Sequence, residues 1–212
     1  MEADWLGRVA YEEAYRIQRF MHAERLAEKT GDRLLLLEHP TVVTVPRRSE
    51  SKNLLLSKEL LRARNAEVVR TDRGGEITLH NPGQLVGYLL CKLEPGGRDL
   101  HSFLRWIEQR LAIVAEAFGV TAHSRKGLTG LWVEDRKVAS IGIAVKRWIT
   151  LHGFALNVNN DLEPFNWIVP CGLSGIRMTS LAVESGHAVP WPLLLEKTRE
   201  AFGAEWSQFA TT

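Results

Sequence analysis

The sequence has few cysteines, and their spacing fits neither a metal site nor a disulfide framework. Only Cys91 and Cys171 occur among 212 residues, which excludes a small disulfide-rich secreted fold and favours a reducing cytoplasm. No apolar run approaches the roughly 20 residues that cross a bilayer. The first residues, Met1 to Trp5, include two acidic side chains and none of the apolar stretch of a signal peptide. We therefore expect a cytoplasmic protein that does not contact membranes.

The chain also lacks a strong excess of charge. Its formal net charge is +2, which is too small to favour nucleic acid as a partner. Hydrophobic residues make up 45% and charged residues 25% of the chain, as is usual for a globular protein with a sizeable core. No internal repeat, low-complexity segment or linker divides the sequence, so we expect residues 1–212 to form a single domain.

Helical periodicity is found in four segments. Apolar residues recur every three or four positions in each of the longer ones, and Gly31 and Gly119 follow two of them where a helix should stop. Ser57 is a suitable N-cap for the short one. The predicted helices are Val9–Lys29, Ser57–Arg64, Asp99–Phe118 and Pro192–Phe202.

Strands are predicted between these helices from β-branched and continuous apolar runs. The charged residues Glu134 to Lys137 are expected to form a tight turn between two of them, and residues 159–175, rich in Asn, Asp, Pro and Gly, a loop. This order of elements implies an α+β fold. The predicted strands are Arg33–Glu38, Thr41–Val45, Glu67–Thr71, Leu85–Cys91, Leu131–Val133, Val138–Val145 and Trp148–Val158.

The segment from Arg73 to Gln84 combines two glycines, a short alternating stretch that ends at His80, and an Asn-Pro-Gly-Gln turn. Glycine pairs allow the backbone to approach a ligand closely. The structural alternative is a strand bracketed by two turns, because Gly and Pro most often mark turns alone. The segment is thus a candidate binding motif that needs support from elsewhere in the chain.

Two further residues are candidates for chemistry. Cys171 lies between Pro170 and Gly172 in the predicted loop, whereas Cys91 lies in an apolar strand and is expected in the core. A reactive cysteine needs a nearby cation to stabilise its thiolate, and Lys137, directly before an apolar strand, is the candidate. Each residue alone also has a structural explanation: an inert cysteine, and a surface lysine at the edge of a hairpin.

Together these motifs resemble the lipoyl(octanoyl) transferase family. The resemblance extends from about Leu34 to Leu181, with the motifs in the family's order. Pro46, Leu79 and Asn81 stand where the family commonly has Gly, Tyr and Gly, and these departures are expected to reshape the mouth of the site. The motifs that carry the resemblance are Glu38-His39-Pro40, Arg73 to Gln84, Gly130 to Val133, Lys137 to Gly142, His152 to Val158, and Pro170-Cys171-Gly172.

The resemblance implies the sheet-centred fold of biotin and lipoate ligases, with a mixed or antiparallel sheet flanked by helices. It also implies octanoyl transfer through an acyl-thioester on Cys171, assisted by Lys137, without cofactor or metal. The implied donor is octanoyl-acyl carrier protein, and the implied acceptors are lipoyl domains of 2-oxoacid dehydrogenases and the glycine cleavage H protein. Glycines of the acyl pocket are expected to let the acyl chain lie against backbone. The residues implied to line the pocket are Arg73, Gly74, Gly75, Glu76, Ile77, Thr78, Leu79, His80, Ser140, Ile141, Gly142, His152, Gly153, Phe154 and Ala155.

Two other functions fit parts of the pattern. An ATP-dependent lipoate or biotin ligase would use the same fold but requires no cysteine nucleophile, and the lack of a P-loop does not decide against it. A non-catalytic module that binds carrier or lipoyl domains would require a closed pocket. For the donor, a basic loop with Arg47, Arg48 and Lys52 is either a docking site for an acidic protein or a solvated loop.

Overall fold

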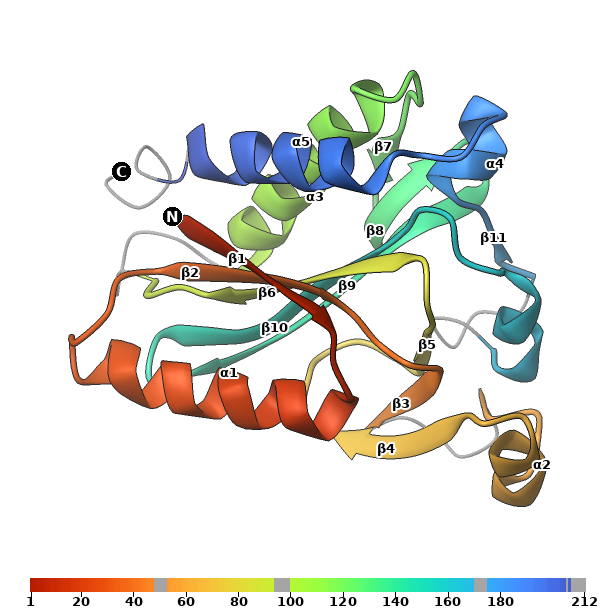
Figure 1. The fold of residues 1–212 in the computed structure, drawn as a ribbon, viewed down its shortest axis with the longest axis horizontal. Coiled ribbons are helices and arrows are strands. Elements are labelled where there is room, and N and C mark those ends of the chain that lie inside the picture. Colours follow the sequence, from red (N-terminus) through yellow and green to blue (C-terminus); the bar gives the residue numbers. More distant parts are fainter. Residues whose placement is uncertain (48–52, 94–99, 170–174, 205, 207–212) are drawn as a thin grey trace.

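The computed structural model describes residues 1–47, 53–93, 100–169, 175–204 and 206. A large mixed sheet forms its centre (Figure 1). The strand order is β1-β2-β6-β10-β9-β8-β7, and β11 pairs with β9 beyond the end of β10. The strands of this sheet are β1 (Glu2–Arg8), β2 (Arg33–Glu38), β6 (Gln84–Leu90), β7 (His123–Arg125), β8 (Leu128–Val133), β9 (Arg136–Lys146), β10 (Ile149–Asn157) and β11 (Arg177–Met178).

Helices cover both faces of this sheet (Figure 1). The helix α1 (Tyr11–Leu26) packs its buried side against one face, where Leu35, Leu37 and Leu151 form part of the core. The helices α3 (Leu100–Glu116) and α5 (Trp191–Ala204) cover the other face with a larger apolar core that includes Phe103 and Phe202. β6 and β10 lie between these two layers and are buried along their whole length, which explains why most of their residues are apolar.

A smaller sheet stands at one end of the large one (Figure 1). It has the order β4-β3-β5 and shares a separate apolar core with its neighbouring helices. Ser57 caps the first of these helices, because its Oγ accepts a hydrogen bond from the amide of Leu60. The elements are β3 (Val42–Pro46), β4 (Glu67–Thr71), β5 (Thr78–His80), α2 (Lys58–Ala63) and the 3₁₀ helix η2 (Glu163–Trp167).

The predicted α+β fold, with a mixed sheet flanked by helices, is confirmed. The predicted helices and strands are present with shifts of a few residues at their ends. Cys91, predicted as core, is fully buried, and burial raises the pKa of its thiol well above the ordinary value. Asp99, the predicted start of the second long helix, lies outside the described residues.

Two local predictions are wrong. The turn expected at Glu134 to Lys137 is shorter: Glu134 takes a left-handed φ of 52°, so Val133 already pairs with Arg136, and Lys137 lies inside β9. The loop expected at residues 159–175 contains η2, because Phe165 and Trp167 are drawn into the apolar core of the small sheet.

Four short elements were not predicted. Three are strands at sheet edges, β1, β7 and β11, whose sequences are polar because they bury little apolar surface. The fourth is the helix α4 (Leu181–Ser185), which Ser180 caps and Gly186 ends in a left-handed conformation. No apolar repeat marks any of them.

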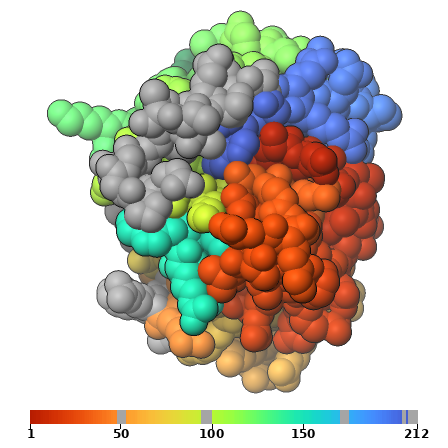
Figure 2. Space-filling model, turned by 90° about the vertical axis from the view of Figure 1, so that its left-hand side faces the viewer, coloured from red at the N-terminus to blue at the C-terminus, as the bar shows by residue number. Residues whose placement is uncertain are grey.

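On the face shown in Figure 2, the C-terminal end of α1 and the chain after it lie beside the hairpin that joins β9 to β10. The two are linked by a contact of 3.0 Å between Nε2 of His22 and the carbonyl oxygen of Lys146. Both residues of the hairpin turn, Arg147 and Trp148, have positive φ, as a type I′ turn requires. Among the described residues, no helix is both long and apolar enough to cross a membrane.

Candidate active site

A cavity of about 380 Å³ lies where the small sheet, the centre of the large sheet and the start of α1 meet. Its walls come from segments far apart in the sequence. β9 and β10 supply one wall, the chain from Arg73 to β5 another, and β8 with the preceding turn closes the end near Lys137. Residues that border the cavity are Tyr11, Arg73, Gly75, Glu76, Ile77, Thr78, His80, Tyr88, Gly127, Leu128, Thr129, Trp132, Lys137, Ser140, Ile141, Gly142, His152, Gly153, Phe154, Ala155 and Ile176.

Nearly all the residues expected to line the acyl pocket border this cavity, and two do not. Leu79 is fully buried in the apolar core of the small sheet, because alternation in β5 turns it away from Thr78 and His80. Gly74 instead donates its amide hydrogen to the carbonyl of Ile143 at 2.8 Å. Cys171 lies outside the described residues. The functional roles of the bordering residues remain predictions.

Arg73 holds the chain before β5 between the two sheets. Its Nη2 donates to Oγ1 and to the carbonyl oxygen of Thr44 in β3, at 2.8 and 3.2 Å. Its Nη1 donates to the carbonyl of Gly74 at 3.1 Å. Because Gly74 also pairs with Ile143 of β9, this segment fastens the small sheet to the large one and forms one side of the cavity.

The glycines serve close packing of the chain on itself. A Cβ on Gly142 would lie 2.7 Å from the carbonyl oxygen of Gly74 and 3.3 Å from Cδ of Arg73. A Cβ on Gly153 would lie 2.1 Å from the carbonyl oxygen of Gly87. The expectation that these glycines give room to a substrate is therefore wrong for both positions: the space beside each is filled by protein backbone.

Tyrosines and uncharged histidines form the wall remote from Lys137. Burial lowers the pKa of His80 well below the ordinary value, and its Nδ1 pairs with Oε1 of Gln84 at 2.8 Å. The hydroxyl of Tyr11 donates to Oγ1 of Thr71 at 3.0 Å. Tyr88 donates to Nε2 of His39, while Nδ1 of His39 donates to the carbonyl of Val9 at 2.6 Å. The tyrosine and histidine side chains of this wall are uncharged, which suits an apolar ligand.

The buried His152 pairs with the partly exposed Asp72 beside the same wall. Nε2 of His152 lies 3.1 Å from Oδ1 of Asp72, and this contact, with further bonds from Lys146 and Tyr15, holds the pKa of Asp72 far below its usual range. Burial lowers the pKa of His152, so the neutral ring donates its Nε2 hydrogen to the carboxylate. His152 also has a φ of 62° inside β10, a strained conformation for a residue other than glycine.

Lys137 is buried at the opposite end of the cavity. Only 3% of it is exposed, which contradicts the structural alternative of a lysine on the surface. Its ammonium donates to the carbonyl oxygen of Thr129 at 2.9 Å and lies 5.1 Å from the ring centroid of Trp132. A buried cation on the wall of a cavity is a candidate for charge stabilisation during a reaction.

The chain that leaves the segment 170–174 runs directly past Lys137. Met178 is opposite Lys137 in the parallel pairing of β11 with β9, and the amide of Thr179 donates to the carbonyl of Lys137 at 3.0 Å. On the other side of the segment, the amide of Val169 donates to the carbonyl of Asn53 at 2.8 Å. The segment that contains Cys171 is therefore attached to the fold at both ends.

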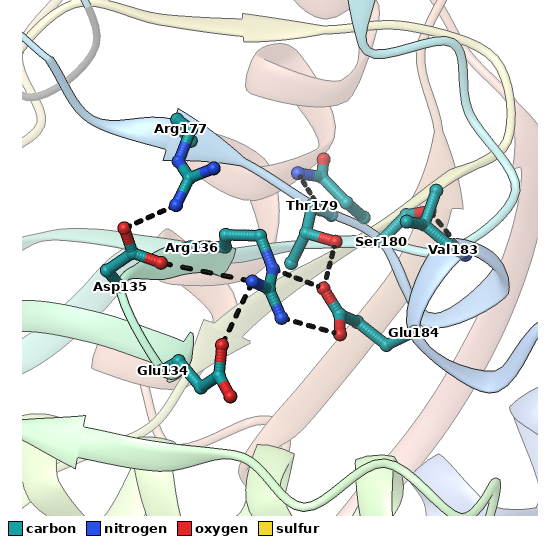
Figure 3. Close-up of polar contacts among 9 residues, drawn as sticks. Glu134, Asp135, Arg136, Arg177, Thr179, Ser180, Val183 and Glu184 are labelled. Atoms are coloured by element: carbon teal, nitrogen blue, oxygen red, sulfur yellow. Dashed lines mark hydrogen bonds and ion pairs between the residues drawn. The ribbon is translucent and has the colours of Figure 1, made fainter.

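An ion-pair network fixes the attachment at β11 (Figure 3). Arg136, the first residue of β9, donates from Nε and Nη2 to the two carboxylate oxygens of Glu184, at 2.8 and 3.1 Å. Thr179 donates to the same carboxylate, and Arg177 pairs with Asp135 at 2.6 Å. The bonds from Arg136 and Thr179 lower the pKa of Glu184, so these contacts hold β11 beside Lys137 at neutral pH.

The three positions that depart from the family pattern do not border the cavity. Leu79 belongs to the small core. Asn81 joins the turn after β5 to the chain after β10, since it donates to the carbonyl of Asp161 at 2.8 Å and accepts from Asn160 at 3.0 Å. Pro46 is buried at the end of β3 opposite Thr71. The expected change at the mouth of the site stays a prediction.

Several residues of the cavity were not identified from the sequence. Tyr11 and Tyr88 were expected only as members of a helix and a strand, Thr129 only as a neighbour of a motif, and Trp132 as part of a motif but not as a pocket residue. A tyrosine among apolar residues is a weak signal of a polar lining, and no stronger signal is present. In the described part of the chain, no group of three or more His, Cys, Asp or Glu residues could hold a metal ion.

The comparisons with known proteins agree with the geometry. Residues 10–203 match the family model of the lipoyl protein ligase A/B catalytic domain. The octanoyltransferase of Caldicellulosiruptor bescii is 44% identical over 201 residues, which cover 94% of this chain and 88% of that protein. The octanoyltransferase of Geotalea uraniireducens is 46% identical over 184 residues, 87% of this chain and 83% of that protein.

Solved structures share the fold at low sequence identity. A lipoate-protein ligase A bound with ATP superposes with a TM-score of 0.75 at 13% identity, covering 96% of this chain and 85% of the ligase. The biotin protein ligase of Aquifex aeolicus, in complex with biotin and ATP, gives 0.58 at 15% identity, with 99% and 72% coverage. These likenesses show the fold alone.

Proposed function

This chain belongs to the octanoyltransferases built on the lipoyl protein ligase A/B catalytic domain, and we propose that Cys171 and Lys137 carry out its reaction. The octanoyl group passes from the thioester of an acyl carrier protein to Cys171, and then to the side chain of a lysine in a lipoyl domain. The whole chain, residues 1–212, serves as one catalytic domain. Acceptors are lipoyl domains of 2-oxoacid dehydrogenases and the glycine cleavage H protein.

The observation that carries the proposal is the position of Lys137. Its buried ammonium borders the cavity, and the chain beside it leads back to Cys171 through Met178 and Ile176. Ile176 itself borders the cavity and lies five residues after Cys171. Five residues span at most about 18 Å, which supports a role for Cys171 at this cavity.

In the first step, the thiolate of Cys171 attacks the carbonyl carbon of the octanoyl thioester. The bond to the carrier's sulfur breaks, and that sulfur leaves with a proton from the ammonium of Lys137. The nearby ammonium favours the thiolate before attack. Because one thioester replaces another, this step has little net change in free energy.

In the second step, the amine of the acceptor lysine attacks the acyl group on Cys171. An amide forms, the bond to Sγ of Cys171 breaks, and the neutral amine of Lys137 takes the proton that the acceptor nitrogen loses. The thiolate and the ammonium are then restored together. The amide is more stable than the thioester, which drives transfer forward.

The alternative of an ATP-dependent ligase is not favoured. Relatives at 44% and 46% identity over most of the chain are octanoyltransferases, whereas a ligase such as the one bound with ATP is similar at 13% identity. That similarity concerns the shared fold, which supports several activities.

The test is intact mass measurement after incubation with octanoyl-acyl carrier protein and no ATP. We expect the chain to gain one octanoyl group, sensitive to hydroxylamine, and to lose it when a lipoyl domain is added. Cys171→Ser should abolish the mass gain. Cys91→Ser is the matched control: this thiol is fully buried, so the variant should still be acylated. Equal losses in both variants would contradict the assignment of the nucleophile.

A further inference from the structure

Glu108 is a buried carboxylate that approaches the site from outside the cavity. It lies on α3, on the side that faces the sheet, and is 1% exposed. A carboxylate in an apolar core is costly unless it is paired. Here Arg105 pairs with one oxygen, and the other accepts the amide hydrogen of Gly130 at 2.9 Å. The partner on the sheet is thus a backbone group of β8.

That backbone group belongs to the peptide that Lys137 binds. The peptide joining Thr129 to Gly130 donates its N–H to Glu108 and accepts the ammonium of Lys137 on its carbonyl oxygen, each at 2.9 Å. Because the peptide is trans, its N–H and C=O point in opposite directions. The carboxylate and the ammonium therefore hold one peptide from its two ends, and each bond polarises the other favourably.

The peptide between Thr129 and Gly130 lies at an irregular point of the sheet, where strand pairing alone does not fix its orientation. The pairing of β8 with β9 shifts register between Leu131 and Trp132, so the sheet is irregular directly after Gly130. Gly130 has a φ of 124°, and a Cβ there would lie 2.6 Å from Cε of Lys137. The orientation of this peptide and the position of the lysine side chain are thus tightly linked.

We propose that Glu108 is a positioning residue of the octanoyl transfer reaction: it fixes the peptide between Thr129 and Gly130 so that its carbonyl directs the ammonium of Lys137 into the cavity. Glu108 does not border the cavity and is therefore not in a position to contact a substrate bound there. The inference rests on the proposed role of Lys137. The simpler alternative is that Glu108 only satisfies a buried amide and contributes to stability.

Steady-state transfer from a small soluble octanoyl thioester to a lipoyl domain separates these alternatives. We expect Glu108→Ala to lower kcat by about tenfold or more, as misplacement of a catalytic group does, with KM for the thioester changed less than about twofold. Glu108→Gln keeps an oxygen acceptor for the amide of Gly130 and should recover most of kcat. If Glu108→Ala fails to fold, Glu108→Met, which fills a similar volume without an acceptor, replaces it.

Thr198→Val is the matched control for stability. Thr198 is fully buried in α5, away from the cavity, and its hydroxyl donates to the carbonyl of Leu194 at 2.7 Å. This variant should lose stability but keep kcat. A kcat for Glu108→Ala within about twofold of the parent at equal folded fraction, or equal losses in the Ala and Gln variants, would overturn the proposal.

A double-mutant cycle with Lys137→Met keeps this test distinct from that of the proposed function. If Glu108 acts through Lys137, Glu108→Ala should not further lower the residual rate of the Lys137→Met variant. Additive losses would overturn the positioning role. Full activity of Lys137→Met alone would instead contradict the proposed function, whatever Glu108 does.

Discussion

Lys137 and Thr179 are joined by a backbone hydrogen bond of 3.0 Å, from the amide of Thr179 to the carbonyl of Lys137. This bond continues the pairing of β11 with β9 to the point where β10 has ended. The strand that carries the candidate base therefore forms one sheet with the chain that follows residues 170–174. Their relative position depends on backbone pairing, which is less sensitive to substitution than a contact between side chains.

Lys137→Arg separates the two proposed roles of Lys137, which are to stabilise the thiolate by its charge and to take a proton from the acceptor lysine. Arginine keeps the positive charge but does not give up a proton in proteins. We expect acylation of Cys171 by a small octanoyl thioester to remain measurable, because the leaving sulfur can depart as a thiolate and take its proton from water. Transfer from acyl-Cys171 to the lipoyl domain should fall by about 100-fold or more, within the range for loss of a general base. Intact mass spectrometry should show that the acyl-enzyme accumulates. Normal overall turnover would rule out the role as base.

Gly142→Ala should disturb the wall formed by the segment after Arg73. The new methyl group would lie 2.7 Å from the carbonyl of Gly74, a contact that requires the backbone to move. Overpacking of this kind costs about 1–3 kcal/mol of stability, and we expect KM for octanoyl donors to rise. Urea unfolding and steady-state kinetics measure the two effects.

Gly203→Ala is the control for this substitution. Gly203 lies in α5, where an added Cβ meets nothing within 4 Å. The change should stabilise the helix by about 0.5–1 kcal/mol and leave KM unaltered. If both alanine variants keep the parental KM, the segment after Arg73 does not contribute to donor binding.

His39 should make the fold sensitive to acid. Burial lowers its pKa to about 4, below the unfolded value of about 6.5, so the unfolded chain binds the proton first. The stabilisation is complete above pH 6.5 and is lost as the pH falls toward 4. At 1.36 kcal/mol per pH unit, His39 alone removes about 3 kcal/mol of unfolding free energy between these values. His80 and His152, with lowered pKa values, act in the same direction.

The measurement is urea unfolding from pH 7 to pH 4. His39→Gln should be less stable at pH 7, because it loses the hydrogen bonds to Val9 and Tyr88. Its free energy of unfolding should, however, decrease less steeply than that of the parent as the pH falls. His187→Gln, at an exposed position, should follow the parental curve. A slope for His39→Gln equal to that of the parent would contradict this account.

The sequence predicts most of the fold because most elements bury a periodic apolar face. The strands Arg33–Glu38 and Glu67–Thr71 were predicted with their observed bounds. Elements that bury little were missed: β1 is an edge strand with charged residues on both sides of its single tryptophan. Burial also explains why Lys137 was wrongly assigned to a turn. Four charged residues in a row indicate a turn, and only the packing of β8 and β11 on either side shows that the fourth is enclosed.

Site residues could be predicted where they belong to a sequence motif. Residues that reach the site from elements distant in the sequence could not. Arg73, His80 and His152 belong to motifs and border the cavity as expected. Tyr11 reaches the same cavity from α1, and Glu108 approaches it from α3, on the other face of the sheet. Periodicity assigns both residues to helices but does not tell which buried face meets the site.

The last prediction concerns docking of the acidic acyl carrier protein. Among the basic residues near the site, Lys146 is paired with Asp72 and Arg73 is bound to Thr44. Arg48 and Lys52 lie outside the described residues. Arg47 is exposed and, with Arg70, borders a surface hollow that also includes Tyr11 and Asp72. Since Tyr11 also lines the cavity, a carrier bound at this hollow would lie close to the site.

Neutralising Arg47 and Arg48 together should therefore raise KM for octanoyl-acyl carrier protein and spare a small octanoyl thioester. Exposed ion pairs contribute up to about 1 kcal/mol each, so a rise of about three- to tenfold at low salt is expected, and it should shrink near 0.15 M salt, where the Debye length is about 8 Å. Arg199→Ala, at an exposed position on α5, should leave KM unchanged for both donors. Equal kinetics of the double variant and the parent with both donors at low salt would show that the carrier docks elsewhere.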